Sequence, residues 1–144
     1  MITFNFHRTE TPLGKAIRFF SGGMVNHVSI QIGEWIWEAD FKRGVVKTDI
    51  SKWNKQHQIV CQYIVYTPYQ STIVYWLNKQ VGKKYDWFGV LSFLWAGFGE
   101  RRGFWFCSEL GAVVLAKALN MYGFNQRQSP QNLLDNLMVY EHTK

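Results

Sequence analysis

A predicted β-hairpin at residues 26–40 restricts the fold of this chain more than any other feature of its sequence. Apolar and polar residues alternate along residues 27–32, the dipeptide Gly33-Glu34 follows, and a second alternating run leads to residue 40. Alternation on both sides of a glycine-containing dipeptide is typical of two antiparallel strands joined by a two-residue turn. Such a turn pairs Ile32 with Trp35. We therefore expect the first half of the chain to be mostly sheet.

Further strands and helices are expected on both sides of this hairpin. The predicted strands are residues 2–6, 44–48 and 58–66, and a short final strand near Val139. The predicted helices are residues 12–20, opened by Thr11-Pro12; a helix capped by Ser71 or Thr72 and ended by Gly82; residues 86–98; residues 107–119; and a short helix opened by Ser129-Pro130. Because strands dominate the first half and helices the second, the fold class is expected to be α+β.

Length and composition predict one domain that covers residues 1–144. The 144 residues are 47% apolar, which is enough for one core and short for two. The formal net charge of +6 favours an anionic partner such as a cell-wall polymer, nucleic acid or lipid headgroups. Residues 1–7 lack the features of a signal peptide, so we expect a protein that is cytoplasmic when synthesised. The longest apolar run, residues 87–98, is too short to cross a bilayer, although it could contact one.

The two cysteines occupy different sequence environments. Cys61 lies inside the predicted strand 58–66, where a cysteine usually acts as a small buried hydrophobic residue. Cys107 lies where an aromatic segment gives way to a helical pattern, so its thiol is expected at a helix N-terminus. The backbone N–H groups there favour thiolate over thiol, and they can also hold an oxyanion during acyl transfer. The competing interpretation is a buried structural cysteine.

His27 is the candidate base for this thiol. On the pleat of its strand His27 shares a face with Ser29, and the hairpin register places Ser29 opposite Glu38 and His27 opposite Asp40. Either carboxylate can accept a hydrogen bond from the imidazole, which would fix its tautomer and stabilise the imidazolium. A structural histidine is the alternative, and a register slip of one residue would remove the carboxylates from this face.

The remaining histidines and the spacing of possible ligands point to no second site. His7, His57 and His142 are all interpreted as surface residues. The sequence has no Cys-x-x-Cys motif and no closely spaced histidine pair, so neither a metal site nor a cofactor is expected.

Five short segments follow one another in an order that is characteristic of a known superfamily. They are Asn26-His27-Val28-Ser29-Ile30, Trp37-Glu38-Ala39, Gly82-Lys83-Lys84-Tyr85-Asp86, Phe106-Cys107-Ser108-Glu109-Leu110 and Ser129-Pro130-Gln131-Asn132-Leu133. Together they resemble the permuted branch of the NlpC-type papain-like superfamily, which contains cell-wall peptidases, amidases and relatives of lecithin retinol acyltransferase. The resemblance covers residues 26 to about 133, with the histidine ahead of the cysteine.

The resemblance implies a circularly permuted papain-like fold, in which an antiparallel sheet of about five to six strands packs against the nucleophile helix. Cys107 would attack an amide, ester or thioester carbonyl, and His27 would relay the proton. Glu38 would orient His27, with Asp40 as the alternative. Tyr85, Asp40 and Ser108 would lie near the substrate, although a packing role for the Tyr85 ring is also open.

The same resemblance narrows the function to a cysteine peptidase or amidase. The acyltransferase relatives carry an Asn-Cys-Glu-His-Phe motif and often a membrane segment, whereas this chain has Phe-Cys-Ser-Glu-Leu and no spanning run. Peptidoglycan stem peptides are the implied substrate. Phage or cell-wall proteins are implied as further partners, reached in a virion or at the cell envelope, and nucleic acid is not expected. Two alternatives stay open, namely lipid or thioester acyl chemistry and a non-catalytic basic binding or virion-structural module.

Overall fold

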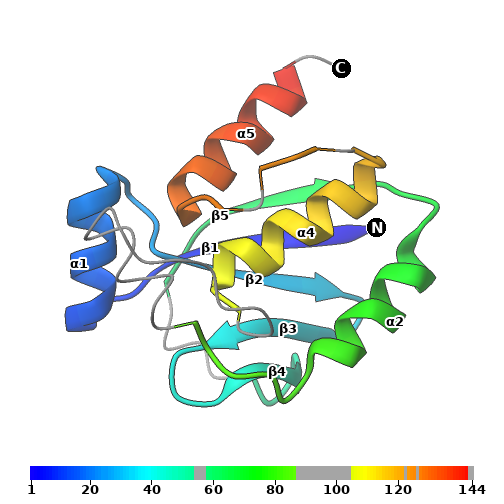
Figure 1. The fold of residues 1–144 in the computed structure, drawn as a ribbon, viewed down its shortest axis with the longest axis horizontal. Coiled ribbons are helices and arrows are strands. Elements are labelled where there is room, and N and C mark those ends of the chain that lie inside the picture. Colours follow the sequence, from blue (N-terminus) through cyan, green and yellow to red (C-terminus); the bar gives the residue numbers. More distant parts are fainter. Residues whose placement is uncertain (54–57, 87–104, 122, 126, 143–144) are drawn as a thin grey trace.

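The strands of the described residues form one antiparallel sheet (Figure 1). The computed structural model describes residues 1–53, 58–86, 105–121, 123–125 and 127–142. The strand order across the sheet is β4-β3-β2-β1-β5. The strands are β1 (Ile2–Arg8), β2 (His27–Ile32), β3 (Trp35–Asp40), β4 (Gly44–Asp49) and β5 (Gln58–Val65). The predicted α+β class is confirmed, with five strands and four helices in the described chain.

The predicted hairpin is present with the expected register. Ile32 pairs with Trp35, Gln31 with Ile36 and Ile30 with Trp37. Gly33 has a φ of +59°, a left-handed conformation that glycine adopts without steric cost and that a two-residue hairpin turn requires.

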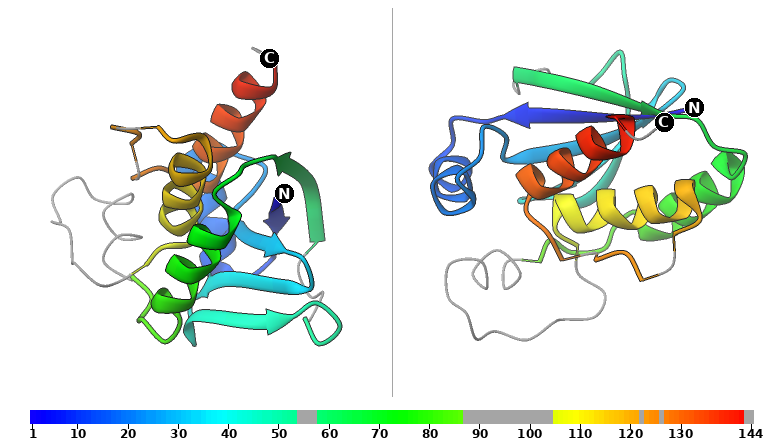
Figure 2. Two further views of the ribbon diagram at one scale, coloured as in Figure 1. Left: turned by 90° about the vertical axis from the view of Figure 1, so that its right-hand side faces the viewer. Right: turned by 90° about the horizontal axis from the view of Figure 1, so that it is seen from above.

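Three helices cover one face of the sheet, as two views of the ribbon show (Figure 2). They are α2 (Gln70–Gln80), α4 (Cys107–Leu119) and α5 (Pro130–His142). Helix α4 packs on β2 and β3 and lies between the other two. The fourth helix, α1 (Pro12–Ser21), lies beyond one end of the sheet (Figure 1). Both ends of this helix agree with the prediction. The Thr11 hydroxyl caps its start by accepting a hydrogen bond from Gly14 N at 3.1 Å, and Gly22 ends it with a φ of +64°.

Helix α4 approaches the sheet closely because Gly111 faces both β2 and α5. A Cβ atom at this position would lie 2.8 Å from Leu133 Cδ2 and 3.4 Å from Val28 Cγ1. The first distance is shorter than ordinary van der Waals contact, so a larger residue would push the helix outwards. The absence of a side chain at Gly111 therefore helps to hold the N-terminal half of α4, including Cys107, against β2.

Two predictions about the helical half of the chain are wrong. The short final strand near Val139 does not form, because α5 continues to His142. Leu133, Leu134 and Leu137 recur at helical spacing and are buried, whereas Val139 is 63% exposed, so a helix buries this segment better than a strand would. In addition, α2 begins at Gln70 after Tyr69, without the predicted Ser71 or Thr72 cap.

Two further expectations concern residues 86–98. The predicted helix there lies outside the described residues, apart from its first residue. Among the helices of the described chain, none combines the length and the apolar character that a membrane span requires.

Candidate active site

The N-terminus of α4 carries Cys107 in its first turn. The Glu109 carboxylate accepts a hydrogen bond from the backbone N–H of Phe106 at 3.2 Å, which defines where the helix begins. Such a start leaves backbone N–H groups of the first turn directed at the thiol end of the helix. The Cys107 side chain is buried, with 1% of its surface exposed. The residue is thus at the helix N-terminus, the position that the sequence predicted.

The imidazole of His27 lies between Cys107 and Glu38. Its Nε2 is 2.9 Å from Glu38 Oε2, and the side chains of His27 and Glu38 are only 14% and 4% exposed. The imidazole also hydrogen-bonds with the Cys107 thiol. Because Nε2 is occupied by Glu38, Nδ1 is the ring nitrogen that remains for the sulfur. The structure therefore brings together all three residues that were predicted to act in catalysis.

The electrostatics of this chain favour the protonated imidazole. Burial by itself lowers the pKa of His27, but the negative charges and hydrogen bonds of Cys107 and Glu38 outweigh it and raise the pKa to about 10. His27 is therefore an imidazolium at neutral pH. The Cys107 sulfur therefore lies beside both a cation and the positive end of the α4 dipole.

Glu38, rather than Asp40, is the carboxylate that contacts His27. Asp40 Oδ1 instead accepts the backbone N–H groups of Lys42 and Arg43, at 2.9 and 2.8 Å. Burial opposes ionisation of Asp40, but these two N–H groups and the Arg43 guanidinium hold its pKa below the usual value. Asp40 thus stabilises the turn that leads from β3 to β4. Sequence reasoning left the two carboxylates as alternatives because the hairpin register puts both on the imidazole's face.

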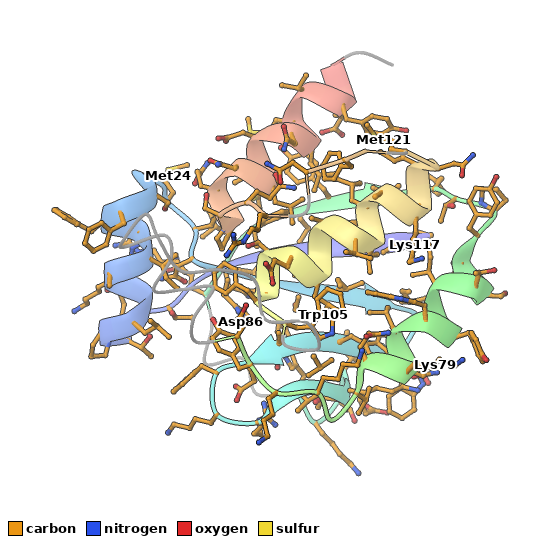
Figure 3. The ribbon with its side chains drawn as sticks, viewed as in Figure 1. Met24, Lys79, Asp86, Trp105, Lys117 and Met121 are labelled. Carbon is orange, nitrogen blue, oxygen red and sulfur yellow. The ribbon has the colours of Figure 1, made fainter. Side chains whose placement is uncertain are left out.

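Tyr85 lies close to the same centre. Its ring is 7% exposed and meets Phe106 edge-on, with the ring centroids 6.0 Å apart. Burial, followed by the negative charge of Cys107, raises the pKa of the phenol well above its usual value, so the hydroxyl is a neutral hydrogen-bond donor. The backbone on both sides is tied down, because Asp86 N donates to Trp105 O and Trp105 N donates to Lys84 O, both at 3.0 Å. Asp86 and Trp105 both lie near the first turn of α4 (Figure 3).

A pocket opens beside His27 and Tyr85. Its walls come from the β1–α1 connection, from α1, from the start of β2 and from the end of β3. The lining residues are Thr9, Thr11, Leu13, Gly14, Ile17, Asn26, His27, Ala39, Asp40, Phe41 and Tyr85. The mixture of apolar and polar side chains is typical of a small binding site. We call it the His27 pocket.

Asn26 fixes the geometry of this pocket. Its side-chain oxygen accepts from Thr9 N at 2.9 Å and from the Thr9 hydroxyl at 3.1 Å, while its amide donates to Thr9 O at 2.8 Å. A Cβ atom at Gly14 would lie 2.7 Å from Thr9 O and 2.6 Å from the Asn26 amide nitrogen. Asn26, the residue just before His27, therefore links the start of β2 to the chain ahead of α1. The absence of a side chain at Gly14 lets α1 approach this junction.

Ser108, predicted near the substrate, is not brought to the His27 pocket. It is fully buried, and its hydroxyl donates a hydrogen bond to Gln128 O. Ser108 therefore links the start of α4 to the segment that precedes α5.

The interpretation of His7 as a surface residue is wrong. β1 continues two residues beyond Phe6, so His7 lies opposite His27 and is completely buried. Its Nε2 is 2.9 Å from the Ser29 hydroxyl, and its ring centroid lies 5.5 Å from that of His27 and 5.3 Å from that of Trp53. The alternation of residues 2–6 extends to His7 but puts it on the polar face with Thr3 and Asn5, so that signal could place it in the strand and did not indicate its burial. His57 lies outside the described residues, as does the side chain of His142.

The second cysteine and the possible metal ligands were considered next to this site. Cys61 is half-buried in β5, and burial raises the pKa of its thiol, as suits a packing residue. Within the described ranges, no three His, Cys, Asp or Glu side chains are grouped closely enough to hold a metal ion.

The chain was compared with known protein families, curated proteins and solved structures. No protein-family model, no curated protein and no solved structure matches the chain. The case for a function therefore depends on the geometry around Cys107.

Proposed function

We propose that this protein is a cysteine hydrolase that cleaves an amide bond through a covalent acyl-enzyme. The observation that carries the proposal is the continuous arrangement of thiol, imidazole and carboxylate formed by Cys107, His27 and Glu38. A nucleophile, a base and a group that orients the base are the three parts that acyl transfer requires. The α+β architecture and the order of these residues along the chain agree with a permuted papain-like fold.

The proposed reaction needs no group beyond these side chains and water. The Cys107 thiolate attacks the carbonyl carbon, and backbone N–H groups at the start of α4 stabilise the oxyanion. The C–N bond then breaks, and the departing amine takes the proton of the His27 imidazolium. Neutral His27 next removes a proton from water, which attacks the thioester. Cleavage of the C–S bond releases the acid and restores the thiolate–imidazolium pair.

The proposed substrate is a peptidoglycan stem peptide. Support comes from the resemblance of the five sequence segments to cell-wall peptidases and amidases. The formal net charge of +6 also suits an anionic polymer, because it raises the local concentration of an acidic substrate.

The first test is the pH dependence of Cys107 alkylation by iodoacetamide, followed by peptide mass spectrometry. Because the thiol is buried, the shape of the profile is more informative than the absolute rate. We expect reaction to persist well below pH ~8.5, where an ordinary thiol loses reactivity. His27→Ala should reduce this advantage, because the imidazolium is gone and only the N-terminus of α4 remains beside the sulfur.

Cys61 is the internal control in the same peptide digest. Burial raises the pKa of its thiol, so its alkylation should require alkaline pH in both proteins. If Cys107 is inert, or titrates like an ordinary thiol whether or not His27 is present, the catalytic proposal fails. The non-catalytic binding module would then take its place.

Lipid or thioester acyl chemistry is a second candidate, favoured by exposed aromatic side chains on α1. Phe19 and Phe20 are 82% and 55% exposed, and Met24 just beyond the helix is 65% exposed. The same helix lines the His27 pocket through Leu13 and Ile17. An amphipathic helix that ends in exposed aromatic residues is suited to inserting into a lipid surface.

A vesicle assay separates the two substrates. If the function is lipid chemistry, the parent should co-sediment with vesicles that contain anionic phospholipid. A Phe19→Ser/Phe20→Ser variant should bind at least about tenfold more weakly, because two apolar side chains no longer enter the bilayer. Lys79→Gln, a charge change elsewhere on the surface, is the control. No binding by the parent would exclude this candidate and leave the amide substrate.

A further inference from the structure

A second pocket, of about 300 Å³, lies between the β3–β4 turn and the segment after α2. That volume exceeds the ~30 Å³ share of a water molecule by far, so it can hold a carboxylate together with part of the chain that bears it. Its lining residues are Phe41, Lys42, Arg43, Gly44, Gly82, Lys84 and Tyr85. Three of the seven are cationic, and we call it the cationic pocket.

The backbone holds the two sides of this pocket together. Val45 N donates to Lys83 O at 2.8 Å, and Gly82 N donates to Val45 O at 2.9 Å. Gly44 has a φ of +74°, and a Cβ atom there would lie 2.2 Å from Lys83 O. A side chain at position 44 would therefore force the two segments apart. The proximity of Lys84 to the β3–β4 turn is thus a built feature of the fold.

The cations of the pocket are incompletely neutralised. Within the part of the chain that the structure describes, neither Lys42 nor Lys84 forms an ion pair. The Arg43 guanidinium lies 3.5 Å from Asp40 and 3.7 Å from Glu38, which is longer than the 2.7–2.9 Å of a strong charge-assisted hydrogen bond. Glu38 is already engaged by His27. An anion in the pocket would relieve the repulsion among the three cations.

The cationic pocket adjoins the His27 pocket. Phe41 and Tyr85 line both of them, so the two pockets share these walls. Arg43 also contacts Glu38, the partner of His27. Only the Glu38 side chain therefore separates a group bound to Arg43 from the His27 imidazole, which would serve Cys107.

We propose that the cationic pocket binds a carboxylate of the substrate and thereby selects acidic peptides. This inference rests on the proposed function, because it assigns the pocket to the substrate of Cys107. Arg43 can present a planar pair of N–H donors to a carboxylate, and Lys42 and Lys84 add positive charge at the rim. The substrate would carry its free carboxylate close to the scissile amide.

The coupling of this pocket to Cys107 is tested with maleimides that differ only in charge. Each pair has the same N-alkyl spacer of two to five carbons and ends in a carboxylate or in the corresponding amide. Rates at Cys107 are divided by those with free cysteine. We expect the carboxylate reagent of the best spacer to react at least about tenfold faster than its amide partner, an advantage of about 1.4 kcal/mol.

Two lysine variants assign that preference to the pocket. Lys42→Gln/Lys84→Gln should lower the ratio of the carboxylate rate to the amide rate by at least about threefold, because two of the three cations that line the pocket are gone and only Arg43 remains. Lys79→Gln removes a charge on α2 (Figure 3) from a residue that does not line the pocket, and it should keep the advantage. Equal rates for the two reagents in the parent, or an equal loss in both variants, would overturn the inference while the reactivity of Cys107 stands.

An NMR titration tests binding without any reaction. N-acetyl-D-glutamate should shift the amide signals of Gly44 and Gly82 in the parent, and it should shift them less in the double variant at the same concentration, because Arg43 alone binds the carboxylate more weakly. Shifts with glycerol phosphate and none with N-acetyl-D-glutamate would overturn the carboxylate assignment in favour of a phosphate ligand. Carboxylate-dependent shifts in a protein whose Cys107 is inert would retain the binding site and reject the proposed function.

Discussion

Replacing His27 with alanine is expected to lower the rate of amide hydrolysis by about 10²–10⁴-fold. His27 donates to Glu38 through Nε2 and hydrogen-bonds with the Cys107 thiol, so its removal takes away both the stabilising cation and the proton relay. The rate is measured with purified peptidoglycan stem peptides, by quantifying the newly released amino groups. Cys107→Ser should lose activity to a similar or greater extent, because the acyl-enzyme then requires an unactivated hydroxyl.

The matched control for the cysteine is Cys61→Ser. This residue is half-buried in β5 and lies outside the catalytic group, so its activity should stay close to that of the parent. Circular dichroism of each variant verifies the fold. Hydrolysis at the parental rate by a folded His27→Ala protein would refute the assignment of this histidine as the base.

Replacing Glu38 with glutamine is expected to lower the free energy of unfolding by about 3 kcal/mol at pH 7. Glu38 is a buried carboxylate beside the His27 imidazolium, and removal of one partner from a buried ion pair leaves the other charge uncompensated. Urea denaturation at pH 7 measures the loss. Asp40→Asn is the matched control, since asparagine keeps the oxygen that accepts from Lys42 and Arg43, and it should cost less than about 1 kcal/mol.

Glu38→Gln should also change the pH dependence of stability. The pKa of His27 is about 10 in the folded protein and ~6.5 in an unfolded chain. A raised pKa in the folded state stabilises the protein fully below pH ~6.5, and this contribution is lost as the pH rises to about 10. The parent should therefore lose stability across this window, relative to His27→Gln. In Glu38→Gln the loss should be smaller and complete at a lower pH, because the imidazolium has one negative partner fewer.

Comparison of Glu38→Gln with Asp40→Asn also shows which of the two carboxylates controls the His27 imidazole. A similar loss of stability and a similar pH profile in Asp40→Asn would mean that the hydrogen bond between His27 and Glu38 does not govern the protonation of the imidazole. The orientation of His27 would then have to be assigned to other contacts.

Much of the fold could be predicted because it depends on residues that are close in sequence. The hairpin at residues 26–40 follows from alternation and a turn, and α4 follows from the spacing of apolar residues after Cys107. The start of α1 follows from the hydroxyl of Thr11 and the proline after it. These signals are local, so tertiary contacts reinforce them and do not need to create them.

The sequence by itself determined the candidate nucleophile at a helix start and a histidine with carboxylates on its own face. The tertiary structure decided which residues come into contact across long sequence separations. It brings Cys107 to His27 and buries His7 opposite His27. It also decided that Glu38 binds the imidazole, whereas Asp40 stabilises the β3–β4 turn. It also continued α5 through the segment predicted as a strand and brought Lys84 to the β3–β4 turn. The physical reason is that periodicity records which side of an element is buried, whereas partners are selected by the packing of all elements at once.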